Sequence, residues 1–318
     1  MIEDLKSIYG RAPAIFQRIR GEIGKVMIGQ DMAIEQLLVA VLSGGHALLE
    51  SNPGLGKTLL IKTTAMTMGL TFSRIQCTPD LMPADITGTT IIEEVDGGKR
   101  FRFEAGPIFA NIVLADEINR ASPKTQSAML ESMQEKQVTV GNHTYRLEPP
   151  FFVLATQNPI EMEGTFPLPE AQLDRFLMKI KMEYPTIDEE LGIVERYTGR
   201  ADPRVERVVS KEELLALQQL CREVPISADL TRAAIQVTTA TRKWEGVQYG
   251  ASPRASIGLI LAAKARAMLL GRNYVDREDL HQMAYPILRH RIILTFEAER
   301  RGVTSDQVIT AILKENKV

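Results

Sequence analysis

Short apolar runs alternate with helical segments through roughly the first 185 residues of the chain. Runs typical of strands lie at residues 46–50, 71–77, 111–115, 151–156 and 177–184. Helical periodicity occupies 57–68 and 123–136, and an earlier helix is predicted from the candidate N-cap Asp31 to Gly44-Gly45. Alternating strands and helices indicate a mostly parallel sheet covered on both faces. We therefore predict an α/β fold with a mostly parallel five-stranded sheet.

The pattern changes after Tyr184-Pro185, where the strand signal fades and helical segments punctuated by proline and glycine follow. This change predicts a second, smaller and all-α domain. The expected organisation is an N-terminal helical segment at 1–25, an α/β core at 26–185, a linker at 186–205 and a helical domain at 206–318.

Two β-hairpins are predicted to interrupt the α/β core. The first spans residues 90–104 around Asp96-Gly97-Gly98, and the second spans 137–147 around Gly141-Asn142. Both turns contain residue types that accept the positive φ angles of tight hairpins.

Composition and charge narrow the range of possible functions and cellular locations. The 318 residues include 38 Lys and Arg against 40 Asp and Glu, and this balance disfavours a dedicated binder of nucleic acid or of anionic membranes. Cys77 and Cys221 lie far apart without a Cys/His cluster, which favours buried thiols in a reducing compartment. The N-terminus lacks the apolar core of a signal peptide, and no apolar run reaches the roughly 20 residues of a membrane span. We expect a cytoplasmic protein without membrane insertion.

A glycine-rich loop follows the first predicted strand and opens a helix. Residues 51–58 meet seven of the eight positions of the phosphate-binding pattern G-x-x-x-x-G-K-[ST]. Backbone N–H groups and the helix N-terminus would surround phosphate oxygens, Lys57 would neutralise the β- and γ-phosphates, and Thr58 would bind Mg²⁺. The departure is Ser51 in place of glycine, which restricts the backbone angles there. The expected nucleotide contacts are Asn52, Pro53, Gly54, Leu55, Gly56, Lys57, Thr58 and Leu59.

Two later strands end in polar residues that suit ATP hydrolysis. The strand at 111–115 runs into Asp116 and Glu117, and we expect it beside the strand of the phosphate loop. Asp116 would hold Mg²⁺, and Glu117 would polarise the attacking water. Asn158 follows the strand at 151–156, where it either orients that water or serves as a turn residue before Pro159.

These motifs together resemble the MoxR family of AAA+ ATPases, to which the magnesium-chelatase ATPase subunit is closely related. The resemblance covers about residues 20–300 and rests on the phosphate loop and three further stretches. Those stretches are Asp116-Glu117-Ile118-Asn119-Arg120, Ala155-Thr156-Gln157-Asn158-Pro159 and Pro169-Glu170-Ala171-Gln172-Leu173-Asp174-Arg175-Phe176.

The resemblance implies an ATPase that works as a homo-oligomer, usually a hexameric ring with nucleotide between neighbours. It implies that Asn158 is the first sensor and that Arg175 is an arginine finger for the adjacent subunit. Arg254, within Ser252-Pro253-Arg254-Ala255, resembles the second sensor of the lid and would serve a neighbour's nucleotide. Ile28 and Gly29 resemble the segment that contacts adenine through its backbone.

Other segments also resemble parts of this family. The hairpins match an insert in the second helix and a hairpin before the first sensor, so Phe101 and Phe103 either contact substrate or pack within the domain. The stretch 288–291 is either a subunit interface or a solvated helix face. His46 and His143 need no metal role, because packing explains them.

The resulting functional hypothesis is an ATP-dependent remodelling chaperone that helps mature or assemble protein complexes. The resemblance implies a protein substrate, a partner with a von Willebrand factor A domain, and metal or cofactor insertion as one form of maturation. The alternative is a nucleic-acid-associated motor, which the neutral charge disfavours. The missing guanine-reading motif disfavours a GTPase or small-molecule kinase. The presence of Glu117 and Arg175 disfavours a nucleotide-binding scaffold that does not hydrolyse ATP.

Overall fold

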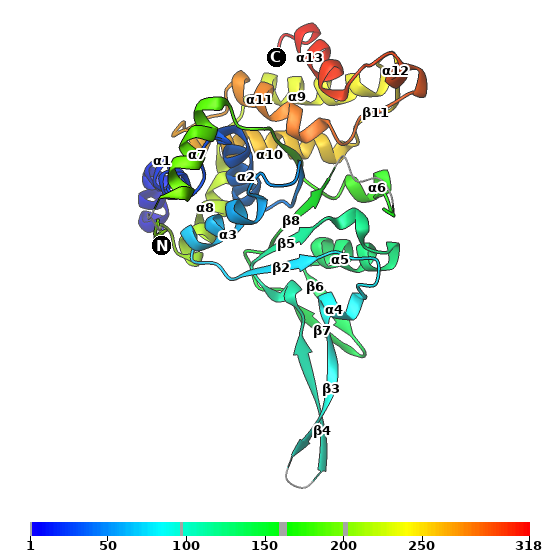
Figure 1. Ribbon diagram of the computed structural model, residues 1–318. Helices are drawn as coiled ribbons and strands as arrows, with labels where there is room; N and C mark the ends of the chain where they lie inside the picture. Colours follow the sequence, from blue (N-terminus) through cyan, green and yellow to red (C-terminus); the bar gives the residue numbers. More distant parts are fainter. Residues whose placement is uncertain (1, 96–97, 159–163, 200–202) are drawn as a thin grey trace.

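A five-stranded, wholly parallel sheet forms the centre of the protein (Figure 1). The computed structural model describes residues 2–95, 98–158, 164–199 and 203–318. The sheet order is β2-β5-β8-β1-β9. The strands are β1 (Ala47–Ser51), β2 (Phe72–Gln76), β5 (Ile112–Asp116), β8 (Phe152–Gln157) and β9 (Met178–Met182). All five predicted strands and the predicted α/β class are therefore confirmed.

The sheet is buried on both faces, and successive residues of its strands enter two different hydrophobic clusters. In β5, Ile112 and Leu114 belong to the larger cluster, whereas Val113 and Ala115 belong to the smaller one. Side chains alternate across a strand, so one short sequence supplies both faces. The helices on the larger side include α1 (Ile2–Gly24), α2 (Asp31–Ser43) and α3 (Lys57–Thr67), and α5 (Pro123–Glu135) lies on the other.

Three local expectations are corrected or refined by the structure. Gln30, with φ 63°, is the N-cap of α2, so Asp31 is its first helical residue and makes no capping bond. The N-terminal segment joins the main core, because Phe16, Ile19 and Ile23 of α1 are buried in the larger cluster. The predicted linker contains α7 (Ile187–Thr198), which begins with a capping box between Thr186 and Glu189.

A helical domain follows. Its helices are α8 (Lys211–Glu223), α9 (Ala228–Ala240), α10 (Pro253–Leu269), α11 (Arg277–Leu288), α12 (Phe296–Arg300) and α13 (Ser305–Glu315), with β10 (Val247–Tyr249) paired antiparallel to β11 (Ile293–Leu294). The shorter elements of the chain are α4 (Pro83–Thr87), α6 (Glu170–Leu173), η1 (Pro107–Phe109), η2 (Ile118–Arg120) and η3 (Thr241–Lys243). Among the described residues, no helix is long and apolar enough to cross a membrane.

A buried charge network fastens this helical domain to the core. Arg266 of α10 donates from Nε to Glu35 Oε1 of α2 at 2.8 Å and from Nη1 to Asp279 Oδ1 of α11 at 2.9 Å. Asp279 is fully buried and also accepts from Arg272, whose pKa is raised by that bond. Removing one partner from such a network leaves a buried charge uncompensated, which is strongly destabilising.

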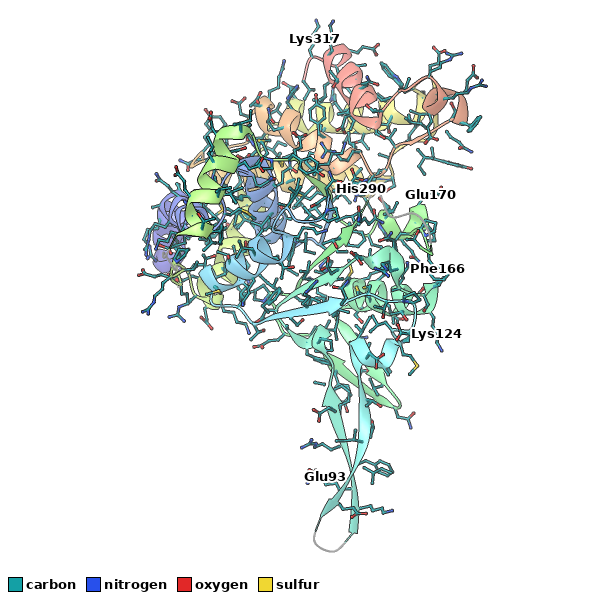
Figure 2. All side chains as sticks on the ribbon, in the orientation of Figure 1. Glu93, Lys124, Phe166, Glu170, His290 and Lys317 are labelled. Atoms are coloured by element: carbon teal, nitrogen blue, oxygen red, sulfur yellow. The ribbon has the colours of Figure 1, made fainter. Side chains whose placement is uncertain are left out.

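Two hairpins project from the core. The first pairs β3 (Gly88–Val95) with β4 (Gly98–Ala105), and the second pairs β6 (Gln137–Val140) with β7 (His143–Arg146). Gly141 has φ 61°, as expected for its turn, whereas residues 96–97 lie outside the described residues. The β3–β4 hairpin extends well beyond the rest of the molecule, and Figure 2 shows the Glu93 side chain on its outer part.

The two phenylalanines of the first hairpin have different environments. Phe103 stacks on Tyr145 of the second hairpin with ring centroids 4.0 Å apart and meets Phe109 edge-on at 5.7 Å. Phe101 is 73% exposed, and its strand partner Ile92 is 58% exposed. Packing within the domain therefore explains Phe103, and Phe101 remains available for contact.

We predict that Phe103→Ala loosens the base of the first hairpin and that Phe101→Ala does not. Loss of the aromatic contacts should cost roughly 1 kcal/mol, which corresponds to about fivefold faster amide exchange in the paired hairpins. Hydrogen–deuterium exchange of residues 98–105 and 143–146 measures this. Equal exchange in the two variants would show that the Phe103–Tyr145 stack does not hold the hairpins together.

Candidate functional site

The candidate site lies along the edge of the sheet where the parallel strands end. The phosphate loop follows β1, Asp116 is the last residue of β5 and Glu117 comes directly after it, and Asn158 follows β8. We expected β5 beside the phosphate-loop strand, and this expectation is wrong. β8 pairs with both β1 and β5 and therefore separates them. Because β5 pairs with β2 and β8, the β8 strand and its Asn158 lie between the loop and the two acids. Ligands of parallel sheets bind beyond this carboxyl edge.

The phosphate loop has the backbone that anion binding requires. Gly54 and Gly56 have φ angles of 84° and 80°, which favour glycine. Gly56 is the N-cap of α3. Glycine has no side chain to cap the first N–H groups of the helix, so these groups can bind an anion. Lys57 and Thr58 begin this helix and are half-buried.

The serine that departs from the glycine pattern does not distort the loop. Ser51 is the last residue of β1, where it pairs in register with Met182 of β9. It lies outside the positive-φ region, and its hydroxyl donates to the Asn52 carbonyl at 2.9 Å. The turn begins after Ser51, so a side chain is tolerated at this position.

A cavity of about 450 Å³ adjoins the phosphate loop, within the size range of small-ligand sites. Ile28 lines this cavity. Gly29 has a left-handed backbone with φ 70°, and a Cβ at this position would overlap the Glu189 carboxylate. Tyr197 also lines the cavity and donates from its hydroxyl to the Val26 carbonyl at 2.6 Å. The lining is Val26, Met27, Ile28, Gln30, Pro53, Gly54, Leu55, Gly56, Leu59, Tyr184, Pro185, Glu190, Ile193 and Tyr197.

Asp116 is held at the edge of the sheet by two neighbouring strands. Its side chain is 8% exposed. Oδ1 accepts from Thr156 Oγ1 of β8 at 2.7 Å, and Oδ2 accepts from Arg74 Nη2 of β2 at 2.6 Å. Burial disfavours an unpaired carboxylate, and these two donors compensate for it.

Glu117 adopts an uncommon backbone conformation, with φ 56° and ψ 52°. Its N–H donates to Thr156 Oγ1 at 2.8 Å, so one hydroxyl fixes both acids. Its Oε2 accepts from Arg120 Nη1 at 3.1 Å and from Gln76 Nε2 at 3.3 Å. A left-handed non-glycine residue costs roughly 1–3 kcal/mol and often marks a functional position.

The donor set fits a magnesium–nucleotide complex. Among the described residues, no group of three His, Cys, Asp or Glu side chains could hold a metal ion. Mg²⁺ at phosphate sites normally uses one or two protein ligands and takes its other ligands from phosphate and water. Thr58 and Asp116 match that requirement. Asn158 is buried at the neighbouring strand end, and residues 159–163 lie outside the described residues.

Arg175 and Arg254, the predicted arginine finger and second sensor, line one cavity that is separate from the phosphate loop. Arg175 and Arg254 line a cavity of about 240 Å³ with His46, Met133, Gln134 and Asp174, and this described lining contains no phosphate-loop residue. Ser252 caps α10 by accepting from the Arg254 N–H at 3.2 Å, and Pro253 is the first helical residue. Arg254 Nη1 lies 3.8 Å from Asp174 Oδ2.

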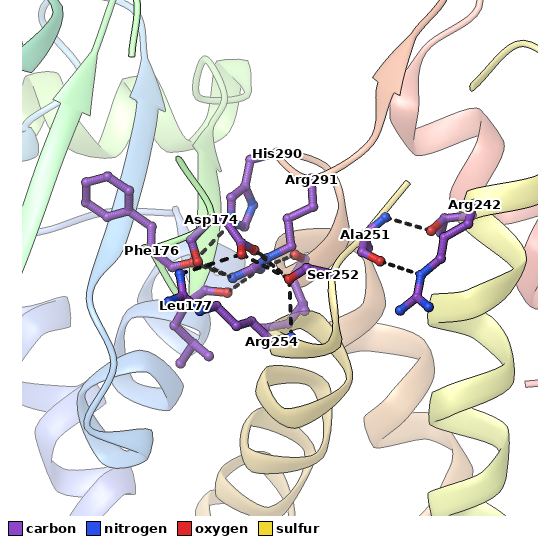
Figure 3. A network of polar contacts seen from close by, with 11 residues as sticks. Asp174, Phe176, Leu177, Arg242, Ala251, Ser252, Arg254, His290 and Arg291 are labelled. Carbon is purple, nitrogen blue, oxygen red and sulfur yellow. Dashed lines mark hydrogen bonds and ion pairs between the residues drawn. The ribbon is translucent and has the colours of Figure 1, made fainter. Parts of the chain in front are cut away.

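Two histidine-containing stretches have structural roles. Both ring nitrogens of His46 have backbone partners, since Nδ1 accepts from Val153 N–H and Nε2 lies 3.0 Å from the Met133 carbonyl. Burial lowers the pKa of His46 to about 4, so the ring is neutral at pH 7. The solvated-face interpretation of residues 288–291 is wrong, because His290 and Arg291 are 8% and 7% exposed. Figure 3 shows both side chains within a network of polar contacts.

Several residues around the acids were missed by the sequence analysis. Arg74, Gln76, Arg120 and Thr156 all contact Asp116 or Glu117. Arg74 and Gln76 are two residues apart and lie on the same face of β2. This polar pair at the end of a predicted strand was the sequence signal that could have identified them. Their partners could not be identified without the strand order.

Comparisons with known proteins agree with this geometry. Residues 46–178 match the family model "ATPase family associated with various cellular activities (AAA)", and residues 239–312 match the model "AAA lid domain". Chaperone MoxR1 of Mycobacterium tuberculosis is 45% identical over 92% of this chain and 79% of its own length. Protein MoxR of Methylorubrum extorquens is 34% identical over 93% of this chain and 92% of its own length.

A solved structure extends the similarity to three dimensions. The crystal structure of a candidate ATPase from Cytophaga hutchinsonii superposes with a TM-score of 0.91 at 44% identity, covering 98% of this chain and 97% of that one. The similarity therefore includes the sheet, the phosphate loop and the helical domain together.

We predict that Thr156→Val lowers ATP turnover and leaves nucleotide affinity nearly unchanged. The valine has a similar shape but leaves the Glu117 N–H and Asp116 Oδ1 without their shared partner, which should lower the free energy of unfolding by about 1–3 kcal/mol. Steady-state kinetics, nucleotide titration and urea unfolding measure these effects. Thr156→Ser keeps the hydroxyl and is the matched control; if it loses as much turnover as Thr156→Val, the hydroxyl is not the group that matters.

Proposed function

Because the chain belongs to the MoxR family of AAA+ ATPases and hydrolyses ATP, we propose that it is a remodelling chaperone that uses ATP to mature or assemble protein complexes. The observation that supports this proposal is that the phosphate loop and the two arginines line separate cavities. We interpret these cavities as two halves of an ATPase site. Such a division suits an assembly in which neighbouring subunits complete each other's sites.

The first half binds and positions the nucleotide. Ile28 and Gly29 would border the base, and residues 52–59 would surround the phosphates. Lys57 supplies positive charge, and Thr58 and Asp116 would hold Mg²⁺, which supplies further charge neutralisation when bound. Glu117 accepts a hydrogen bond from the attacking water and orients it, and Asn158 sits where it can direct the same water toward the γ-phosphate.

The second half faces the nucleotide of a neighbouring subunit. An arginine that reaches the transferring phosphoryl group stabilises the charge of the transition state and can raise the rate roughly 10³-fold or more. Arg175 takes this role, and Arg254 supplies a second cation from the same cavity. We propose a closed homo-oligomer, most simply a hexameric ring, as the working form.

The protruding β3–β4 hairpin is the proposed contact for a protein substrate. It presents Phe101 and Ile92 to solvent. Arg102 is paired with Glu93 at 3.5 Å and with Glu104 at 3.0 Å, so its charge is compensated within the hairpin. Exposed apolar side chains beside a compensated arginine suit a protein better than a phosphate backbone.

The finer biological role follows the family. We propose a partner protein with a von Willebrand factor A domain and include metal or cofactor insertion among the forms of maturation. Cys77 and Cys221 are buried free thiols whose pKa values burial raises to about 12, so neither is primed for reaction. Buried free thiols are consistent with the reducing environment of the cytoplasm, which we propose as the location of the protein.

We predict that Glu117→Gln retains ATP binding but loses ATP hydrolysis, because the amide cannot polarise water. Lys57→Ala should lose both, since the phosphates lose their fixed cation. Nucleotide titration and phosphate release measure the two properties separately. Wild-type turnover in Glu117→Gln would eliminate the proposed role of this carboxylate.

The Glu117→Gln variant also tests the chaperone function directly. In the presence of ATP it should hold its protein substrate and partner, because release awaits hydrolysis. Affinity capture followed by mass spectrometry identifies them, with Lys57→Ala plus ATP as the matched control that cannot enter the ATP-bound state. Enrichment of nucleic acid in place of protein would contradict the chaperone function and favour a nucleic-acid motor.

A further inference from the structure

Arg291 is an arginine buried at the junction between the helical domain and the core. Its side chain is 4% exposed, and it lies just after α11. Nε donates to Asp174 Oδ1 at 2.7 Å, Nη1 donates to the Leu177 carbonyl at 2.9 Å, and Nη2 donates to the Phe176 carbonyl at 2.6 Å. All three nitrogens therefore bind the short segment 174–177, as Figure 3 shows. A lysine could not bind these acceptors simultaneously, because only the guanidinium presents a rigid fork.

The segment that Arg291 binds contains the proposed arginine finger. Residues 174–177 connect α6 to β9, and Arg175 lies between the two residues that Arg291 contacts most directly. His290 adds a bond from its Nε2 position to the Phe176 carbonyl at 3.1 Å. Burial keeps the pKa of His290 well below its usual range, so this ring is neutral. The backbone on both sides of Arg175 is thus fixed by residues of the helical domain.

Asp174 links the same residues to the second cation. Its Oδ2 accepts from the Ser252 hydroxyl at 2.9 Å, and that hydroxyl caps the helix on which Arg254 lies. Asp174 therefore joins Arg291 to the start of α10. Asp174 also lines the cavity that Arg175 and Arg254 line, and its Oδ2 lies 3.8 Å from Arg254 Nη1.

We propose that Arg291 and Asp174 are positioning residues that set the place of Arg175 and Arg254 for a neighbour's nucleotide, and that they make this place depend on the helical domain. The proposal rests on the function of Arg175 in the neighbouring site. Among the described residues, none of the hydrogen-bond partners of Arg291 lines the nucleotide cavity. It acts through the segment it holds, and a shift of about 1 Å in a reacting group can lower a rate roughly 100-fold.

The test uses full-length Arg291→Lys, with Asp174→Asn as a second variant that removes the same charge pair with little change of volume. Both should bind ATP with wild-type affinity and lose about 10- to 100-fold in kcat with little change in KM. Arg272→Lys is the matched control, because it alters another buried Arg–Asp pair of the helical domain away from this segment. It should keep wild-type kcat.

Subunit mixing separates positioning from general damage. Lys57→Ala subunits have a defective nucleotide site but an intact arginine pair. Mixed with Arg291→Lys subunits, they should restore turnover in the intact nucleotide sites of the latter. Mixing Arg291→Lys with Arg175→Ala should restore nothing, because both lack a working finger.

The outcomes distinguish the function of Arg175 from the positioning role of Arg291 and Asp174. Wild-type turnover in Arg175→Ala would overturn the proposed function of the finger. Loss in Arg175→Ala with wild-type kcat in both Arg291→Lys and Asp174→Asn would overturn the positioning role alone. Loss in Arg291→Lys that Lys57→Ala subunits fail to restore would show damage to the variant's own nucleotide site and would also overturn it. If Arg291→Lys does not fold, Asp174→Asn is judged by the same criteria.

Discussion

A parallel sheet must be covered on both faces, and this constraint organises the whole molecule. Each strand feeds two hydrophobic clusters by alternation, as Ile112 and Val113 do in β5. Helices must therefore connect the strands across both faces. Every strand then runs in the same direction, which brings the phosphate loop, the two acids and Asn158 to one edge. The site is thus a consequence of how the core is buried.

Charge compensation and hydrogen bonds from neighbouring strands determine how Asp116 and Glu117 are positioned at the carboxyl ends of the strands. Asp116 is buried with partners on both flanking strands, Arg74 on β2 and Thr156 on β8. Thr156 also holds the backbone of Glu117 in its left-handed conformation. Strand neighbours therefore orient Asp116 and the Glu117 backbone, while Arg120 of the following turn contacts the Glu117 side chain. The two consecutive carboxylates thus have different partners.

The helical domain contributes more than a cover. It is tied to α2 through Arg266 and Glu35, and to the segment 174–177 through Arg291. Figure 2 shows His290 at this junction, with Glu170 on the adjacent α6. These ties make the position of Arg175 dependent on the helical domain, so the two parts of the chain act on the second half-site together.

The sequence by itself determined the strands, the two-part organisation and the phosphate loop, because these depend on local periodicity and on residue types at short spacing. Gly54, Gly56 and Lys57 form a motif that needs no distant partner. Only the tertiary structure decided that β8 separates β1 from β5, that Phe103 packs while Phe101 is exposed, and that Arg291 is buried against Asp174. Those features depend on contacts between residues far apart in the chain, such as Asp174 and Arg291, whose numbers differ by 117. Local sequence patterns do not indicate such contacts.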